Sequence, residues 1–251
     1  MLPTIQQKLR ELEATHQIRI LYACESGSRA WGFPSPDSDY DVRFIYARAI
    51  IDYLNIIEVK DVIDLPVNEV LDIGGWDIKK ALKLFLKSNS GLFEWLQSPV
   101  VYMDDYGFAG ELRHLMPKYF SPKGAGSHYF SLVLNTVNND LQGEQFKLKR
   151  YFYALRSLLA CKWITDKQTL PPMEFEKLRV LVDDVAFQTT IDELLTIKQG
   201  SDEKTLIAPI PLLDEWLAET LAACRSALAE LTSQHKPVDE LNEVFRKYIL
   251  R

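Results

Sequence analysis

The chain has few cysteines and no long apolar run. Its three cysteines are Cys24, Cys161 and Cys224. They have neither the paired spacing of a zinc site nor the even number of a disulfide framework, so we expect reduced, buried thiols. No apolar run reaches the length needed to cross a bilayer, and we find no internal repeat or low-complexity tract. We therefore expect a cytoplasmic protein that does not bind membranes.

Positive charge is not in excess either. The chain carries 29 Lys and Arg against 35 Asp and Glu, which gives a formal net charge of −6 and a pI near 5.3. A broad, nonspecific nucleic-acid binder normally presents a basic face, so contact with nucleic acid would require a local basic groove. With 251 residues, of which 47% are hydrophobic, the chain can bury a substantial core.

The pattern of helical and strand-like runs changes near residue 100. We predict an α+β protein, with an α/β N-terminal catalytic domain over residues 1–105 and an all-helical domain over residues 106–251. The N-terminal domain should hold a small mixed sheet. The predicted strands are 18–24, 40–46 and 70–73, and the predicted helices are 4–15, 76–87, 106–115, 126–139, 145–164, 173–182, 184–199, 211–234 and 238–249.

Two aspartates one residue apart open the second predicted strand. Alternate residues of a strand face the same way, so Asp39, Asp41 and Arg43 should share one face. The two carboxylates then start about 6.6 Å apart at the backbone and can converge on a hard cation. The alternative is that these aspartates are solvated turn residues.

A glycine-serine step precedes this pair. The β-branched and aromatic run 18–24 leads to Gly27 and Ser28, where a short helix should begin. Such a turn lets backbone N–H groups and the positive end of a helix dipole point at an anion. Gly27 would admit a phosphate close to the backbone, and Ser28 would add a hydroxyl. A divalent-metal site that faces a phosphate cradle is typical of phosphoryl or nucleotidyl transfer.

The combined motif resembles that of a known superfamily. G-S-R-A-W-G at 27–32 followed by D-Y-D-V-R at 39–43 is similar to the signature of the DNA polymerase beta-type nucleotidyltransferases. The sequence is closer still to the RNA repair pathway, or RNA ligase-associated, branch. It shares with that branch G-W-D at 75–77, K-S-N at 87–89 and P-P-M-E-F-E at 171–176.

The resemblance implies a reaction and its site residues. Gly27 and Ser28 would bind the phosphates of a nucleoside triphosphate, and Asp39 and Asp41 would be catalytic residues and the first two ligands of Mg²⁺ or Mn²⁺. The expected reaction transfers a nucleoside monophosphate to a hydroxyl. An RNA end, a protein side chain or a small molecule would accept it, and an RNA end fits the branch.

A third carboxylate should lie on a later strand. Asp72 lies in the apolar run 70–73, and we expect it to be the third catalytic carboxylate and metal ligand. Asp77 is the rival, because it falls at the start of the next predicted helix and would serve that N-terminus instead.

Cationic residues provide further candidates for nucleotide binding. Arg29 lies in the first half of the motif and Arg43 ends the second half, and Lys149, Tyr153 and Arg156 recur at helical spacing. With Lys147 and Arg150, this helix could also contact RNA phosphates, although lysines on an amphipathic helix commonly just face water. A different class of function stays open, namely a non-catalytic nucleotide-binding regulatory or antitoxin-like module.

Overall fold

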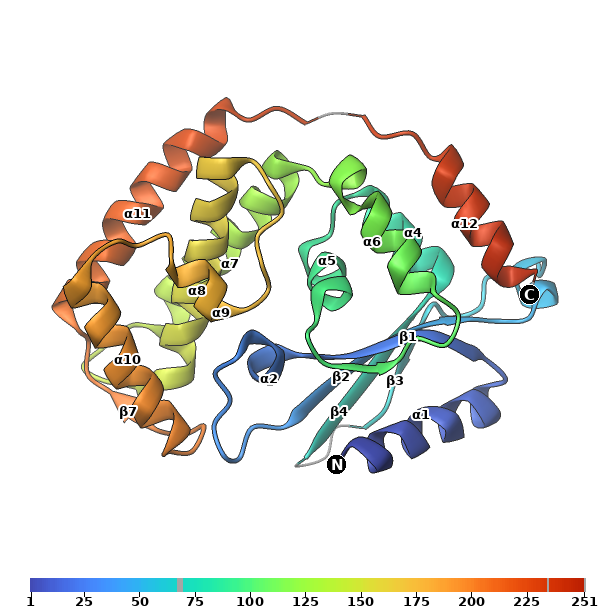
Figure 1. Ribbon diagram of the computed structural model, residues 1–251, viewed down its shortest axis with the longest axis horizontal. Coiled ribbons are helices and arrows are strands. Elements are labelled where there is room, and N and C mark those ends of the chain that lie inside the picture. Colours follow the sequence, from blue (N-terminus) through green and yellow to red (C-terminus); the bar gives the residue numbers. More distant parts are fainter. Residues whose placement is uncertain (67–69, 234, 251) are drawn as a thin grey trace. The chain divides into compact units, whose positions relative to one another are not determined.

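The structure is a computed structural model and describes residues 1–66, 70–233 and 235–250. It is a mixed α+β fold (Figure 1), which confirms the predicted class. The chain divides into two compact units, whose ranges below include the residues outside the described ones, 67–69, 234 and 251. The first unit comprises residues 1–27, 39–119 and 235–251, and the second comprises residues 28–38 and 120–234.

The predicted domain division after residue 105 stays a prediction. The compact units follow a different course, because residues 106–119 and 235–251 belong with the sheet while residues 28–38 belong with the helices. The C-terminal helix is attached to the first unit by specific contacts. The hydroxyl of Tyr119 donates to the Pro237 carbonyl, and Lys118 pairs with Glu240 at 2.6 Å.

A five-stranded mixed sheet forms the centre of the first unit. Its strand order is β3-β4-β2-β1-β5, with β2 and β4 parallel and the other neighbours antiparallel. The strands are β1 (Arg19–Ser26), β2 (Tyr40–Ala47), β3 (Val62–Asp64), β4 (Leu71–Asp77) and β5 (Val101–Met103). The helices are α1 (Leu2–His16), α3 (Ile50–Tyr53), α4 (Ile78–Leu86), α5 (Ser90–Gln97), α6 (Phe108–Tyr119) and α12 (Asp239–Ile249), and α2 (Gly27–Trp31) begins at the unit's boundary.

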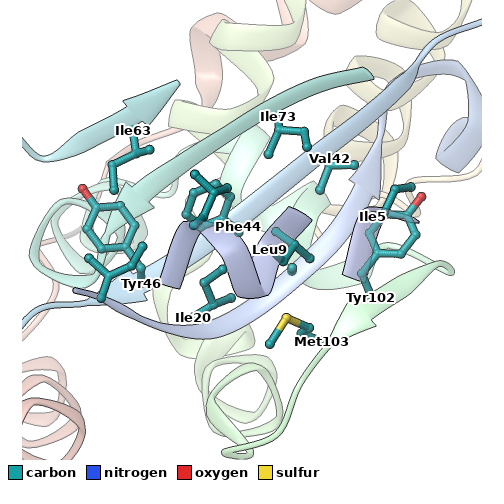
Figure 2. Close-up of a cluster of buried hydrophobic side chains, with 13 residues drawn as sticks. Ile5, Leu9, Ile20, Val42, Phe44, Tyr46, Ile63, Ile73, Tyr102 and Met103 are labelled. Carbon is teal, nitrogen blue, oxygen red and sulfur yellow. The ribbon is translucent and has the colours of Figure 1, made fainter. Parts of the chain in front are cut away.

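Alternation along β2 separates a core face from a polar face. Val42 and Phe44 join Ile5 and Leu9 of α1 in one buried cluster (Figure 2), and Tyr40 packs against it. Figure 1 shows α1 on one side of the sheet and α4, α5 and α6 on the other. Asp41 and Arg43 alternate with these apolar residues along β2 and therefore face away from α1. This arrangement confirms the predicted division of β2 into two faces.

The predicted end of the third strand at residue 73, before Gly74 and Gly75, is wrong. β4 continues through both glycines to Asp77, so the next helix begins at Ile78 and not at 76. The glycines are required by close packing within the sheet. A Cβ atom at Gly75 would lie 2.3 Å from the Phe44 ring, and one at Gly74 would lie 2.7 Å from Asp64 Oδ1.

Four elements of the first unit were not predicted, namely α3, β3, α5 and β5. Helix α5 begins after Asn89, whose side chain accepts a hydrogen bond from the Leu92 amide as an N-cap. Strand β5 has only three residues and pairs with β1 at the edge of the sheet. The asparagine cap was a usable sequence signal for α5, whereas a three-residue strand has too little periodicity to detect.

The second unit is predominantly helical. Its helices are α7 (Pro122–Asp140), α8 (Leu148–Lys167), α9 (Phe175–Arg179), α10 (Val185–Gln199) and α11 (Pro211–Glu230), and β6 (Phe146–Lys147) pairs with β7 (Leu206–Ile207). Three boundaries correct the prediction. Residues 146–147 form a strand before α8, α9 is shorter than 173–182, and α11 ends at Glu230, while Gln234 lies outside the described residues.

The expected state of the cysteines is confirmed. Cys24, Cys161 and Cys224 are free and buried. Across the described parts of the chain, no helix combines the length and the apolar character that a bilayer crossing requires.

Candidate active site

Asp41 and Asp72 meet on the polar face of the sheet. They are register partners on the parallel strands β2 and β4. Both carboxylates bond to one nitrogen of Arg43, because Nη2 lies 3.1 Å from Asp41 Oδ1 and 2.6 Å from Asp72 Oδ2. These side chains are 21 to 29% exposed, so the cluster is open to solvent. The structure thus brings together three of the residues singled out in the sequence.

Gly27 closes this cluster from the neighbouring strand. Ser26 and Asp41 are register partners on β1 and β2, and Gly27 follows with φ of +61°. A Cβ atom at Gly27 would lie 1.9 Å from Asp41 Oδ2. The glycine therefore serves two needs, a left-handed backbone and space for a carboxylate. This contact joins the glycine-serine motif to the aspartate motif.

Glu25 is a site residue that sequence reasoning missed. Its side chain is 1% exposed, and Oε1 accepts a hydrogen bond from the Asp41 amide at 2.8 Å. Oε2 accepts a hydrogen bond from the Tyr102 hydroxyl, and burial together with this bond to a carboxylate raises the pKa of Tyr102. Glu25 thereby fixes the backbone of Asp41 from behind. The available signal was an acidic residue directly after an apolar strand.

The donor chemistry of the pair fits a divalent cation. Two carboxylates that converge on one cationic nitrogen provide the oxygen ligands that Mg²⁺ prefers. Arg43 supplies the positive charge in this structure, and its pKa is raised by Asp72 and Asp41 despite burial. Over residues 1–66, 70–233 and 235–250, no group of three acidic, His or Cys side chains is close enough to hold a metal ion. Asp39, which precedes β2, is therefore not gathered with the other two.

Asp77 lies at the opposite end of β4. It is the N-cap of α4, where Oδ1 accepts from the Lys79 amide at 2.8 Å and Oδ2 accepts from the Tyr53 hydroxyl at 2.8 Å. Burial raises the pKa of Asp77. It pairs in register with Tyr46, five positions along the strands from the Asp41–Asp72 pair. Its observed role is to begin a helix.

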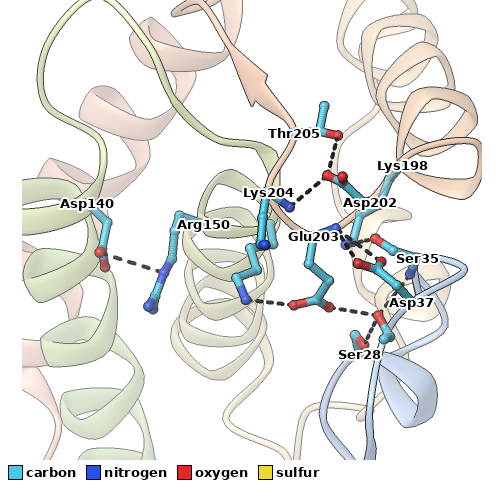
Figure 3. Close-up of polar contacts among 12 residues, drawn as sticks. Ser28, Ser35, Asp37, Asp140, Arg150, Lys198, Asp202, Glu203, Lys204 and Thr205 are labelled. Atoms are coloured by element: carbon cyan, nitrogen blue, oxygen red, sulfur yellow. Dashed lines mark hydrogen bonds and ion pairs between the residues drawn. The ribbon is translucent and has the colours of Figure 1, made fainter. Parts of the chain in front are cut away.

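In the second unit, Ser28 belongs to a chain of hydrogen bonds that ends at Glu203. Ser28 Oγ donates to Ser38 Oγ at 3.2 Å, and Ser38 Oγ donates to Glu203 Oε1 at 2.7 Å (Figure 3). Lys149 Nζ donates to the other oxygen of Glu203 at 2.6 Å. Burial would raise the pKa of Glu203, but the bonds from Lys149 and Ser38 outweigh it and lower the pKa.

The end of α10 and the connection from it to β7 hold the serine loop 28–38 at further points. Lys198 is buried and donates to Ser35 Oγ at 2.8 Å, and burial lowers its pKa. The Glu203 amide donates to the carboxylate of Asp37. Figure 3 shows Lys198, Glu203, Ser35 and Asp37 gathered around this loop. Sequence reasoning missed these residues, because about 165 positions separate the partners.

The other predicted cationic contacts are engaged within the second unit. Arg29 Nη2 donates to the Ser38 carbonyl at 2.6 Å. Arg156 is buried, donates to the Met173 carbonyl and stacks over the Trp31 ring, which also meets Tyr153 edge-on. Arg150 Nε lies 3.6 Å from Asp140 Oδ1. Their roles in nucleotide binding stay predictions, and their observed contacts support the fold.

The resemblance to nucleotidyltransferases predicts an acidic cluster on a small sheet beside a glycine-serine motif. The structure brings Asp41, Asp72 and Gly27 together and does not gather Asp39 with them. The chain belongs to the RNA repair pathway DNA polymerase beta family, whose model matches residues 1–247. This membership supports a nucleotidyltransferase-type function.

Two individual proteins are similar to the chain. The uncharacterized protein YcgL of Bacillus subtilis (strain 168) is 40% identical over 242 residues, which are 96% of this chain and 93% of that protein. A crystal structure of a nucleotidyltransferase-like protein from Exiguobacterium sibiricum 255-15 covers 97% of this chain and 79% of its own, at 13% identity and a TM-score of 0.33. At that TM-score the structural overlap supports no conclusion.

Proposed function

We propose that this protein is a metal-dependent nucleotidyltransferase that moves a nucleoside monophosphate from a nucleoside triphosphate to a hydroxyl. The observation that carries the proposal is the contact of Gly27 with Asp41, while Asp41 and Asp72 share Arg43. The approach of Gly27 to Asp41 supports a single site for phosphate and metal, because one predicted phosphate-binding residue lies against one predicted metal ligand. Membership of the family supports the same reaction class.

The residues of the chain have distinct tasks in this proposal. Asp41 and Asp72 would hold Mg²⁺ or Mn²⁺, and Asp39, which is not gathered with them in this structure, would complete the ligand set. The bound cation would supply charge neutralisation on the phosphates and acidify the acceptor hydroxyl. The oxygen of the acceptor hydroxyl attacks the α-phosphorus, and pyrophosphate departs. Asp72 accepts the proton of that hydroxyl. Glu25 keeps Asp41 in place, because it holds the Asp41 amide.

Pyrophosphate release tests the catalytic proposal. The protein is incubated with each nucleoside triphosphate, Mg²⁺ or Mn²⁺, and a mixture of RNA and protein acceptors. We expect release that disappears in Asp41→Asn and Asp72→Asn and persists in Asp105→Asn, a matched change at an exposed aspartate of the same unit. Nucleotide binding without turnover in any mixture would support the non-catalytic module instead.

Stability measurements separate a metal ligand from a folding residue. Arg43 already offsets the repulsion between the two carboxylates, so Asp72→Asn should cost no more than about 1 kcal/mol of unfolding free energy. Asp77→Asn should keep the N-cap of α4, because Asn caps a helix as well as Asp does, and should leave metal-dependent turnover intact. Loss of turnover in Asp77→Asn with retention in Asp72→Asn would reverse the assignment of the third ligand.

The acceptor is an RNA end in this proposal, which the name of the family favours. Lys149 is the cation of α8 that we expect to contact RNA phosphate, although Glu203 holds it in this structure. RNA binding should weaken steeply with added salt. Short structured and single-stranded RNAs are titrated at two salt concentrations against the wild type, Lys149→Gln and Lys162→Gln. Lys162 is a matched control, because it is also ion-paired on α8. Equal, salt-insensitive binding by all three proteins would favour a protein or small-molecule acceptor.

A further inference from the structure

Two of the three buried cysteines meet where three helices of the second unit pack together. Cys161 lies on α8 and Cys224 on α11, and they are 0% and 2% exposed. Gly126 of α7 allows this approach, because a Cβ atom there would lie 2.5 Å from Leu228, one turn after Cys224. Cys161 Sγ lies 3.6 Å from the Gly126 carbonyl oxygen. The two thiols are therefore brought together from positions 63 residues apart in the chain.

The two thiols lie on neighbouring turns of packed helices. Thr165, one turn after Cys161 on α8, places its hydroxyl 3.9 Å from Cys224 Sγ, and Leu228, one turn after Cys224, packs against Gly126, whose carbonyl oxygen contacts Cys161 Sγ. This arrangement distinguishes the pair from Cys24, which lies on β1 in the first unit. Proximity of two thiols on adjacent elements is the first requirement for a disulfide.

A cavity gives small molecules a route to one of the two sulfurs. About 300 Å³ of space lies between α8 and α11, and Cys224 lines it together with Lys162, Thr165, Asp166 and Glu219. The neighbouring Cys161 thiol lowers the pKa of Cys224, and Thr165 and the Lys162 ammonium act in the same direction, against burial and Asp166. The pKa of Cys161 is raised by the Cys224 thiol and by burial. A thiolate beside a cation and next to open space is the reactive form of cysteine.

We propose that Cys161 and Cys224 are a peroxide-sensitive pair that closes into a reversible disulfide between α8 and α11. The Cys224 thiolate attacks one oxygen of a hydroperoxide, so that an S–O bond forms, the O–O bond breaks and, with H₂O₂, one water leaves. The sulfur of Cys161 then attacks the sulfenic sulfur, the S–O bond breaks and a second water leaves with the remaining proton. Two thiols are oxidised and one peroxide is reduced. The inference is independent of the proposed reaction.

Thiol counting and peptide mapping on the full chain test the pair. Protein treated with H₂O₂ is denatured, its thiols are titrated, and its peptides are mapped without reduction. We expect the count to fall from three thiols per chain to one, a 161–224 cross-linked peptide, and full recovery after dithiothreitol. Cys24 is the internal control, because it lies in the other unit and burial raises its pKa to about 12.

Two variants assign the roles of the sulfurs. Cys224→Ser should keep both of its thiols, whereas Cys161→Ser should lose one as a sulfenic acid that dimedone traps. Wild-type mapping decides the question if either variant fails to fold. Three intact thiols after peroxide, a disulfide that includes Cys24, or cross-links only between chains would each overturn the proposal.

Discussion

Replacing Gly27 with alanine tests the contact on which the candidate site depends. The new Cβ atom would lie 1.9 Å from Asp41 Oδ2 and 2.8 Å from Asp41 Cγ. Since non-bonded carbon and oxygen atoms stay more than about 3 Å apart, the carboxylate oxygen must move by about 1 Å or more. The Asp41 side chain can rotate, but rotation removes it from Arg43 and from Asp72.

The expected magnitudes differ for stability and for activity. A left-handed alanine costs about 1 to 2 kcal/mol, and the lost Asp41–Arg43 pair adds at most about 1 kcal/mol at its observed exposure. The effect on turnover should be larger, because a 1 Å displacement of a catalytic group can cost about 10²-fold. Gly27→Ala should therefore remain folded and lose most of its activity.

Gly107→Ala is the matched control. Gly107 has φ of +71° and belongs to the same unit, but nothing lies within 4 Å of a Cβ atom built there. Both variants thus carry the backbone strain, and only Gly27→Ala displaces Asp41. Urea unfolding, Mn²⁺ titration and pyrophosphate release are measured for both. If Gly27→Ala binds Mn²⁺ and turns over as well as Gly107→Ala, then Gly27 does not hold Asp41 in a working position.

Three further changes test other parts of the structure. Glu25→Leu should lower the unfolding free energy by about 2 to 4 kcal/mol, because the Asp41 amide and the Tyr102 hydroxyl lose their buried acceptor. Denaturant unfolding should show a smaller decrease for Glu25→Gln, and equal decreases for the two variants would contradict this role. The pKa of Glu203 is lowered in the folded protein, so ionised Glu203 stabilises the fold fully above the unfolded pKa near 4.5, and this stabilisation is lost as pH falls through the lower folded pKa. The difference in unfolding free energy between wild type and Glu203→Gln should therefore shrink below pH 4.5. The exposed Glu193→Gln is the control and should show no such change. Gly75→Ala should lower the unfolding free energy by about 1 to 3 kcal/mol through the clash with Phe44. Gly110→Ala in α6, with open space around it, should raise it by up to about 1 kcal/mol. A higher melting temperature for Gly75→Ala than for Gly110→Ala would refute the packing argument.

Sequence periodicity predicted the parts of the fold that local physics decides. The alternation of Asp41, Val42, Arg43 and Phe44 determines which side of β2 is polar, and it holds because a strand has a fixed period of two. The same reasoning failed at Gly74 and Gly75, which usually end strands. Here the Phe44 ring and the Asp64 carboxylate lie so close that only glycine fits, and a neighbouring strand cannot be read from a local pattern.

The candidate site divides in the same way between local and long-range causes. The choice of Asp72 over Asp77 followed from strand geometry, and the structure places Asp72 beside Asp41 and Asp77 at a helix cap. Glu25 and Glu203 could not be assigned from sequence, because their partners are defined only once β1 pairs with β2 and once the 198–205 connection reaches the serine loop. A local motif predicts candidate site residues, whereas contacts between distant segments determine which residues hold them in place.

Charge explains why the acidic motif includes an arginine. Two carboxylates on adjacent strands would repel each other across a half-buried surface, and this repulsion would oppose the pairing of β2 with β4. Arg43 lies two positions after Asp41 and therefore on the same face, where Nη2 contacts both carboxylates and Nη1 donates to the Asp72 carbonyl. The sheet can thus form before any cation is bound. A divalent ion at Asp41 and Asp72 would have to compete with the Arg43 guanidinium for their oxygens, so Mn²⁺ binding should be tighter in Arg43→Gln than in the wild type if these carboxylates are metal ligands.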